Sequence, residues 1–281
     1  MNNNGPAWWT ATCRTAGASR ITNIVKFSKL EKLPDNSPID HFLIRIGELL
    51  KSGTLDVLEA NPHLANLYFA GLISYTENYF REIFSRILEV CPTSQAKASS
   101  RDVKLGSVMW YRTGKLERSA FEHFSFASSE GIIETCKRFF DITINDKSDC
   151  YAVLQEYDRL CELRHGVVHS GGIMSGKNSL KLQLPQTEND TLVFVDFNGF
   201  QEAAQICTDL VAAANTDLFR ILATRWRDDW PKRVPNWNAD MSRARFDHVW
   251  QAFYSSRDNE AGLIPTKLTA ATCRRAISGT P

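Results

Sequence analysis

Residues 162–172 read ELRHGVVHSGG, and they continue an apolar helical pattern that begins near residue 148. Apolar side chains recur there at spacings of three and four, which predicts one buried stripe along a helix of residues 148–169. The members of the stripe are Val153, Leu154, Tyr157, Leu160, Cys161, Val167 and Val168. Gly171 and Gly172 are expected to end this helix, because glycine is common just past a helix C-terminus.

The last turns of this helix carry three residues that a buried helix does not need. Arg164 lies about 20° from Tyr157 and about 40° from Leu160 and Val168, given about 100° of rotation per residue. His165 and His169 are four residues apart on a different face, which they share with Asp158 and Glu162. The pattern therefore predicts a polar edge beside an apolar stripe that contains one charge.

The rest of the chain predicts a mainly α fold, a helical bundle with a small β-hairpin insertion. Ser37 is the expected N-cap of a helix that begins at Pro38 and ends at Gly53. Residues 180–197 alternate apolar and polar side chains around a polar turn, which predicts the hairpin. Further helices are expected over residues 64–90, 102–112, 115–126, 129–140, 199–225 and 241–254.

This reading divides the chain into three parts. Residues 1–20 are expected to form a flexible N-terminal arm, because they are rich in Asn, Ala, Thr and Gly. Residues 21–225 form the expected helical domain, with the hairpin and the helix of residues 199–225 following its core of residues 64–174. Residues 226–281 form a C-terminal helical and aromatic extension.

Composition limits the function classes. The chain has 281 residues, of which 43% are hydrophobic, so it can bury a substantial core. It contains no run of about eighteen apolar residues and no apolar leader, which predicts a cytoplasmic protein that does not enter a membrane. Its seven cysteines are scattered and never spaced as C-x-x-C, which favours reduced thiols over disulfides or a structural zinc site.

Any contact with nucleic acid must be local. With 33 basic and 32 acidic residues the net charge is +1, so the chain has no general positive field. The string RWRDDWPKRVPNW, residues 225–237, interleaves rings and cations as single-strand binders do. The preferred interpretation is structural: the rings bury a helix end and the arginines pair with Asp228 and Asp229.

The helix of residues 64–90 carries a charge of opposite sign to Arg164. Glu77 lies on its apolar stripe, four residues after Ile73 and three before Phe80. An isolated buried charge costs far more than an opposed pair. We therefore expect Glu77 and Arg164 to face one another where the two helices pack, and a purely structural ion pair is an open alternative.

Arg164 and His169 together suit RNA cleavage without a metal. The ribose 2′-hydroxyl attacks the adjacent phosphate, an imidazole moves the proton, and a guanidinium stabilises the charge on the phosphoryl oxygens. One imidazole cannot be both base and acid, so His165 or a second copy of His169 in a symmetric dimer must supply the other proton carrier. Gly166 is the expected dimer contact because it permits close approach of backbones.

The segment RHGVVH resembles the Arg-x-x-x-x-His motif of HEPN domains, specifically the RiboL-PSP-HEPN-like group. The resemblance covers residues 64–174 and includes the glutamate of SYTENYFREIF in the long helix. It implies a helical bundle, commonly dimeric through the motif helices, and often a metal-independent ribonuclease of toxins or antiviral defence. Arg164 and His169 match the two fixed motif positions, whereas His165 stands where asparagine is commoner. Residues beyond about 180 lie outside the resemblance.

The expectation is thus a cytoplasmic HEPN-like endoribonuclease without cofactor or metal that cuts single-stranded or loop RNA. Its expected partners are a second copy of the chain and an antitoxin or defence-system protein. One alternative is an inactive HEPN-like module that binds RNA or serves assembly. Another is zinc held by Glu162, His165 and His169, spaced i, i+3, i+7 on one helix face.

Overall fold

The computed structural model describes residues 11–14, 16–32, 34–111 and 115–279. It divides into two compact units, residues 1–35 and residues 36–281. The expected flexible arm of residues 1–20 lies partly outside the described residues, at positions 1–10 and 15. In the first unit, the helix η2 (Ile24–Phe27) is capped by the Asn23 side chain, which accepts a hydrogen bond from Val25 N.

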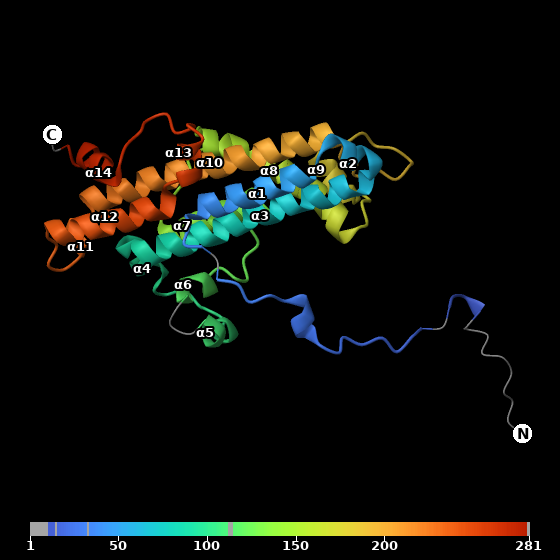
Figure 1. Ribbon diagram of the computed structural model, residues 1–281, viewed down its shortest axis with the longest axis horizontal. Coiled ribbons are helices and arrows are strands. Elements are labelled where there is room, and N and C mark those ends of the chain that lie inside the picture. The colour runs from blue at the N-terminus through green and yellow to red at the C-terminus, as the bar shows by residue number, and fades with distance from the viewer. Residues whose placement is uncertain (1–10, 15, 33, 112–114, 280–281) are drawn as a thin grey trace, which may run out of the picture. The chain divides into compact units, whose positions relative to one another are not determined.

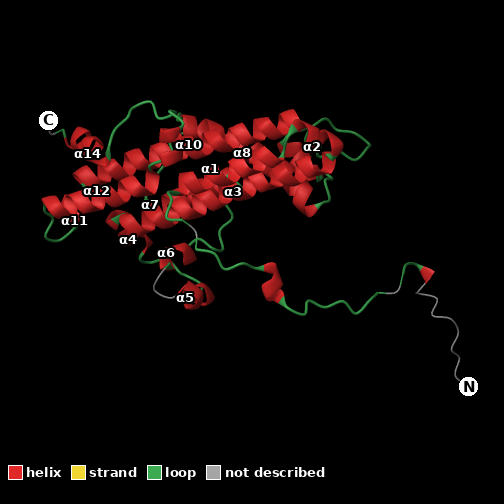
Figure 2. Ribbon diagram, in the orientation of Figure 1, coloured by secondary structure: helices red, strands yellow, loops and turns green. Residues whose placement is uncertain are grey.

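The second unit is helical, as the sequence predicts, and Figures 1 and 2 show its long helices lying side by side. Its elements are α1 (Pro38–Ser52), α2 (Leu55–Ala60), α3 (Pro62–Val90), α4 (Pro92–Ala98), α5 (Leu105–Tyr111), α6 (Leu116–Ser119), α7 (Ser129–Phe140), α8 (Asp149–His169), α9 (Gly176–Lys181), α10 (Phe197–Asp228), α11 (Trp230–Arg233), α12 (Ala239–Phe253), α13 (Ser256–Glu260) and α14 (Ala270–Ser278).

Helix α3 is the centre of this unit, since it packs against α1, α8, α10 and α12. Many of its apolar side chains are almost completely removed from water. The most buried of them are Phe69, Leu72, Ile73, Phe80, Ile83, Phe84 and Ile87. Burial of side chains of this size contributes about 1.5–3 kcal/mol each, so the packing of α3 supplies much of the stabilisation of the bundle.

Capping residues explain why the predicted starts of two helices agree with the structure. Ser37 caps α1 by accepting a hydrogen bond from Asp40 N, and Gly53 follows the last helical residue. Ser148 caps α8 in the same way through Tyr151 N. These boundaries follow from side chains that satisfy the free N–H groups of a first helical turn. The predicted helix of residues 115–126 is much shorter, because only Leu116–Ser119 is helical.

The predicted hairpin of residues 180–197 is wrong. Residues up to Lys181 belong to α9, which Ser175 caps. The described residues contain a single antiparallel bridge in this region, between Ile173 and Leu192. The alternation from residue 191 onward is real, since Val193 and Val195 are buried while Leu192 and Phe194 are exposed. The extended segment pairs with the chain just after α8 instead of with residues 180–184.

The aromatic string near residue 230 is structural, as preferred from the sequence. Trp226 is buried and donates a hydrogen bond from Nε1 to Ser242 O, and Trp230 is completely buried. Arg227 pairs with Asp228 at 2.7 Å, and Arg233 pairs with Asp229 at 2.6 Å. Helix α10 continues through residue 225, where the sequence placed a boundary, and α12 packs against both α10 and α3.

A buried carboxylate joins the two ends of the second unit. Asp40 on α1 is 3% exposed, and it accepts hydrogen bonds from Ser255 Oγ at 2.7 Å and from Ser256 Oγ at 2.6 Å. Two backbone donors at the start of α13, Ser256 N and Arg257 N, complete its shell. Asp40 therefore holds residues 255–257 against the first helix of the bundle.

Replacing Asp40 with alanine should lower the free energy of unfolding by about 2–4 kcal/mol, because four donors lose a charged acceptor and one of them is buried. Asp209→Ala, on the exposed face of α10, should change it by less than about 0.5 kcal/mol. Urea unfolding followed by circular dichroism measures both. Equal stability of the two variants would contradict the role given to Asp40.

Candidate functional site

The candidate site is the C-terminal end of α8. The buried face of this helix, which includes Leu154, Tyr157 and Leu160, packs against α3 and α10. The helix stays regular to His169, and Gly171 and Gly172 follow with φ values of 61° and 94°. These left-handed values favour glycine, so the chain turns sharply after the motif as the sequence predicts.

The structure brings the two histidines together. The His165 and His169 rings are 4.7 Å apart between centroids, with an angle of 50° between their planes. Both side chains are exposed on the last turns of α8. Their contact follows from the i, i+4 spacing, which places side chains one above the other on a helix. Two solvent-accessible proton carriers thus lie next to each other within one chain.

Arg164 lies one residue away from His165 but on the more buried side of α8. Its side chain is partly buried, and its Nε is removed from water with no hydrogen-bond partner among the described residues. A desolvated N–H without a partner is costly. The described contacts include none between Arg164 and either histidine, so the arginine and the imidazoles face different surroundings.

The expected ion pair between Glu77 and Arg164 is wrong. Glu77 Oε1 instead accepts hydrogen bonds from Ser125 Oγ at 3.1 Å and from Phe126 N at 3.0 Å. The segment between α6 and α7 is irregular, so its backbone N–H groups need acceptors outside a helix. Glu77 satisfies one of them, and its position on the apolar stripe of α3 is explained by this structural bond.

Gly166 is not free for a contact between two chains. A Cβ atom built on it would lie 2.9 Å from Met174 Sδ and 3.0 Å from Val193 Cγ2. The residue is buried, and its carbonyl oxygen accepts from Ser170 N and Gly172 N. The expectation of a dimer contact at Gly166 is therefore corrected: the glycine admits the extended segment of its own chain.

Glu162 has a partner other than a metal. Its carboxylate accepts a hydrogen bond from Lys181 Nζ, and this bond raises the pKa of the Lys181 ammonium group. Asp158, on the same polar edge, accepts from Ser129 N at 2.7 Å and Ser129 Oγ at 2.8 Å and so stabilises the start of α7. In the part of the chain that the structure describes, no three His, Cys, Asp or Glu side chains are placed to share a metal ion.

Two asparagines that were not predicted as site residues bond to the backbone of segments next to the site. Asn66 on α3 donates to Val193 O at 3.0 Å and accepts from Val195 N at 3.1 Å. Asn178 on α9 is buried and donates to Glu162 O. A side-chain amide can pair with both groups of a backbone in this way. The only sequence signal was an amide beside the apolar stripe of α3.

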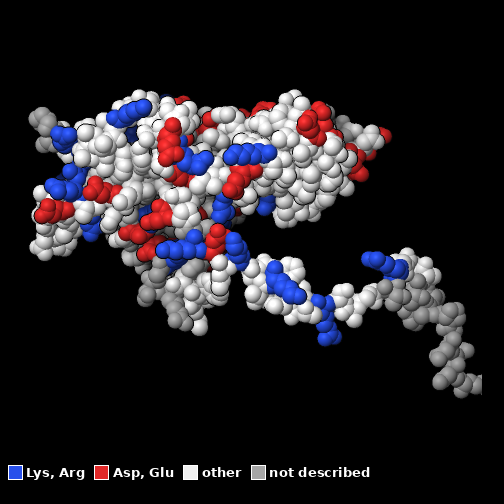
Figure 3. All heavy atoms as spheres, viewed as in Figure 1, with Lys and Arg blue, Asp and Glu red and all other residues white. Residues whose placement is uncertain are grey.

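Charge on the surface is mixed. On the face drawn in Figure 3, Lys and Arg side chains alternate with Asp and Glu over the helical unit. This distribution agrees with the net charge of +1. Within the described ranges, no helix has both the length and the apolar character needed to cross a membrane.

The cysteines lie in the core and not at the site. All seven are free, and six are buried, the exception being Cys13. Burial raises the pKa of Cys150 and of Cys207 to about 12. These thiols are neutral at physiological pH, and reactivity needs the thiolate. They act as small apolar side chains.

Comparisons with known proteins add no family assignment. No protein-family profile, no curated protein and no solved structure matches the chain.

The packing of Gly166 gives a direct test. Alanine replaces glycine in a helix with a gain of about 0.5–1 kcal/mol. Gly47→Ala in α1, where nothing lies within 4 Å of the added Cβ, should show this gain. Gly166→Ala should lose it to the clash with Met174 and Val193, and Gly166→Leu should cost about 1–3 kcal/mol. Thermal unfolding measures all three, and equal gains at both alanine variants would refute the close packing.

Proposed function

We propose that this chain is a metal-independent endoribonuclease of HEPN type that acts on single-stranded or loop RNA in the cytoplasm. The observation that carries the proposal is the exposed His165–His169 imidazole pair on the last turns of α8, beside Arg164. The spacing of Arg164 and His169 supports it through the motif resemblance. The chemistry needs two proton carriers, and the pair supplies both within reach of one phosphodiester.

The reaction proceeds by transesterification. The 2′-oxygen forms a bond to phosphorus while the bond from phosphorus to the 5′-oxygen breaks. One imidazole accepts the proton of the 2′-hydroxyl, and the other donates a proton to the leaving 5′-oxygen. Arg164 stabilises the negative charge on the phosphoryl oxygens. The products are a 2′,3′-cyclic phosphate and a 5′-hydroxyl, and His165 takes the second proton role that the motif alone leaves open.

His169→Ala and Arg164→Ala should each reduce RNA cleavage by roughly 100-fold or more in buffer that contains EDTA. Both variants should unfold near the wild-type temperature, because neither side chain satisfies a buried partner in the structure. The rate of cleavage of a fluorescent single-stranded RNA measures the effect.

The matched controls for this experiment are His248→Ala, an exposed histidine on α12, and Arg159→Ala, an exposed arginine on α8. Both should keep full activity. A substrate with 2′-deoxyribose at the cleavage position should resist. Wild-type cleavage by folded His169→Ala protein would sink the assignment, and complete inactivity of the wild-type protein would favour the alternative, a HEPN-like module that binds RNA or serves assembly.

The proposal includes a homodimer through the end of α8. Exposed apolar side chains gather there on the last turn of α8 and on the extended segment, at Val168, Ile173, Leu192 and Phe194. The bridge between Ile173 and Leu192 fixes two of them side by side. Such groups favour association because burial removes them from water. Restraint or activation by an antitoxin or defence-system protein is part of the same proposal.

Leu192→Ser combined with Phe194→Ser should weaken the dimer and lower RNase activity together, while the helical circular dichroism signal stays unchanged because both side chains are exposed. Leu105→Ser, an exposed leucine on α5, is the control and should leave both properties unchanged. Sedimentation velocity measures the assembly. An active wild-type monomer at assay concentration would refute the homodimer and leave the His165–His169 pair of a single chain as the two proton carriers.

A further inference from the structure

A second pocket lies away from α8, among α10, α12 and residues 255–265. Its volume is about 330 Å³, which falls in the range of about 300–1,000 Å³ that small-molecule sites occupy. Its apolar lining residues include Leu263, Ile264 and Pro265. The pocket is built entirely from the second unit, and its residues have no role in the proposed ribonuclease reaction.

Aromatic rings form one wall of this pocket. Trp250 and Tyr254 stack with a centroid distance of 4.8 Å and an interplanar angle of 22°. Phe219 meets Trp250 edge-on at 6.1 Å and 77°. All three side chains are partly exposed and line the pocket. Electron-rich ring faces attract organic cations through their quadrupoles, and tryptophan does so best.

A carboxylate without a paired cation lies in the same pocket. Asp258 lines it and has no ion-pair partner among the described residues. Burial raises the pKa of the Asp258 carboxyl group, and the charge on nearby Asp40 raises it further. The neighbouring Ser255 side chain and the charge of Arg257 act in the opposite direction without cancelling the increase. The ionised carboxylate is therefore destabilised there, and a cation in the pocket would relieve that cost.

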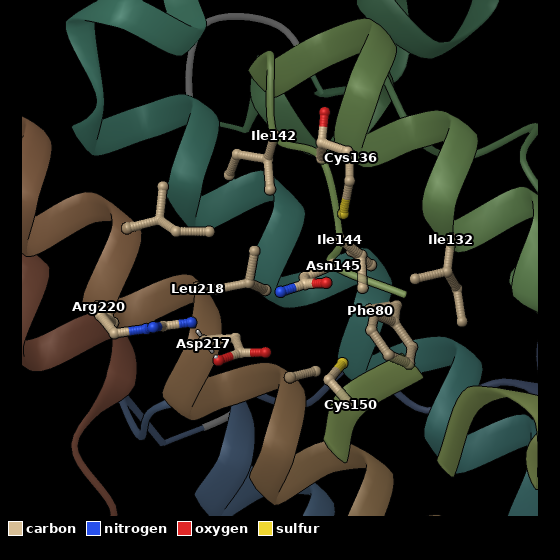
Figure 4. A pocket seen from close by; sticks show the side chains of 13 residues that line it. Phe80, Ile132, Cys136, Ile142, Ile144, Asn145, Cys150, Asp217, Leu218 and Arg220 are labelled. Atoms are coloured by element: carbon tan, nitrogen blue, oxygen red, sulfur yellow. Dashed lines mark hydrogen bonds and ion pairs between the residues drawn. The ribbon is translucent and has the colours of Figure 1, made fainter. Parts of the chain in front are cut away.

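The pocket shown in Figure 4 provides a contrast. It lies among α7, α8 and α10, and its volume of about 60 Å³ leaves room for little more than water. Its carboxylate, Asp217, already pairs with Arg220 at 2.9 Å. The neutral thiols of Cys136 and Cys150 line it. That pocket has neither the space for an organic cation nor an unpaired carboxylate to bind one.

We propose that the pocket formed by Phe219, Trp250, Tyr254 and Asp258 binds a small organic cation, an apolar body that carries one ammonium or quaternary nitrogen. The ring faces contact the apolar groups around the nitrogen, and the Asp258 carboxylate supplies the opposite charge. Asp40 adds negative potential, although its own hydrogen bonds are already satisfied within the fold. The proposal is independent of the RNase activity and is tested without RNA.

The test compares two ligands of nearly the same shape. Phenyltrimethylammonium carries a permanent positive charge, and tert-butylbenzene is its uncharged isostere. Isothermal titration calorimetry with the full chain should show the cation binding at least about tenfold more tightly than the isostere, because the cation alone gains from the ring faces and the carboxylate. Equal affinity for the two ligands, or no measurable binding of the cation at millimolar concentration, would overturn the proposal.

Two variants locate the site. Asp258→Asn should weaken binding of phenyltrimethylammonium by about tenfold, and Trp250→Leu should weaken it by a similar factor. Glu260→Gln is the matched control, because Glu260 lies on the same short helix but is exposed and outside the pocket. Circular dichroism checks that each variant is folded. If Trp250→Leu protein does not fold, the affinity of Asp258→Asn protein alone decides the test. Unchanged affinity in folded Asp258→Asn protein would refute the assigned carboxylate.

The pH dependence adds a readout that a purely apolar cavity does not have. The cation favours ionised Asp258, so its affinity should be full above the raised pKa of that group and should fall as the pH drops through it. The fall should begin at a higher pH than for an ordinary aspartate, and it should be absent in Asp258→Asn. Because the probe does not titrate, a wild-type affinity that is constant down to about pH 4 would contradict the proposal.

Discussion

The packing of α3 against α1, α8, α10 and α12 is the constraint on which the rest of the structure depends. Because α3 contacts α1, α8, α10 and α12, much of its surface is removed from water. Its polar side chains must therefore find partners on other elements. Arg81 illustrates this: it donates to the carbonyl oxygens of Phe121 and Phe124 and lies 5.6 Å from the centroid of the Phe126 ring. Together with Glu77, it holds the irregular segment of residues 121–126 in place.

The same constraint shapes the candidate site. Asn66, near the start of α3, pairs with the backbone of residues 193 and 195 and so holds the extended segment beside the end of α8. Gly166 admits that segment because any side chain there would meet Met174 and Val193. The two histidines remain on the solvent side, where their contact requires only helical geometry. The site is thus a helix end that packs against the extended segment on one side and exposes its imidazoles on the other.

The proposed ribonuclease site and the proposed cation pocket lie in different parts of one bundle and contain different chemical groups. The end of α8 offers two exposed imidazoles and one guanidinium whose Nε is desolvated and unpaired. The pocket beside α12 offers aromatic faces and a carboxyl group whose ionised form is destabilised by burial. In both places an unpaired charge lies close to apolar surface. An unpaired charge of this kind lowers the stability of the fold, and a bound ligand of opposite charge offsets that cost. Unpaired charges near apolar surface therefore mark candidate sites.

The sequence by itself determined the long helices α1, α3, α7, α8, α10 and α12, and it placed Arg164, His165 and His169 at the end of α8, whereas the short helices α2, α4 and α9 were not predicted. Apolar periodicity and capping residues such as Ser37 and Ser148 are local, and local geometry decides them. The spacing of His165 and His169 fixed their contact for the same reason. Tertiary structure alone decided the partners of Glu77, Gly166 and residues 191–195. Each of these depends on which distant segment packs against the group in the folded chain. The local sequence around Glu77 does not show that Phe126, 49 residues away, is its partner.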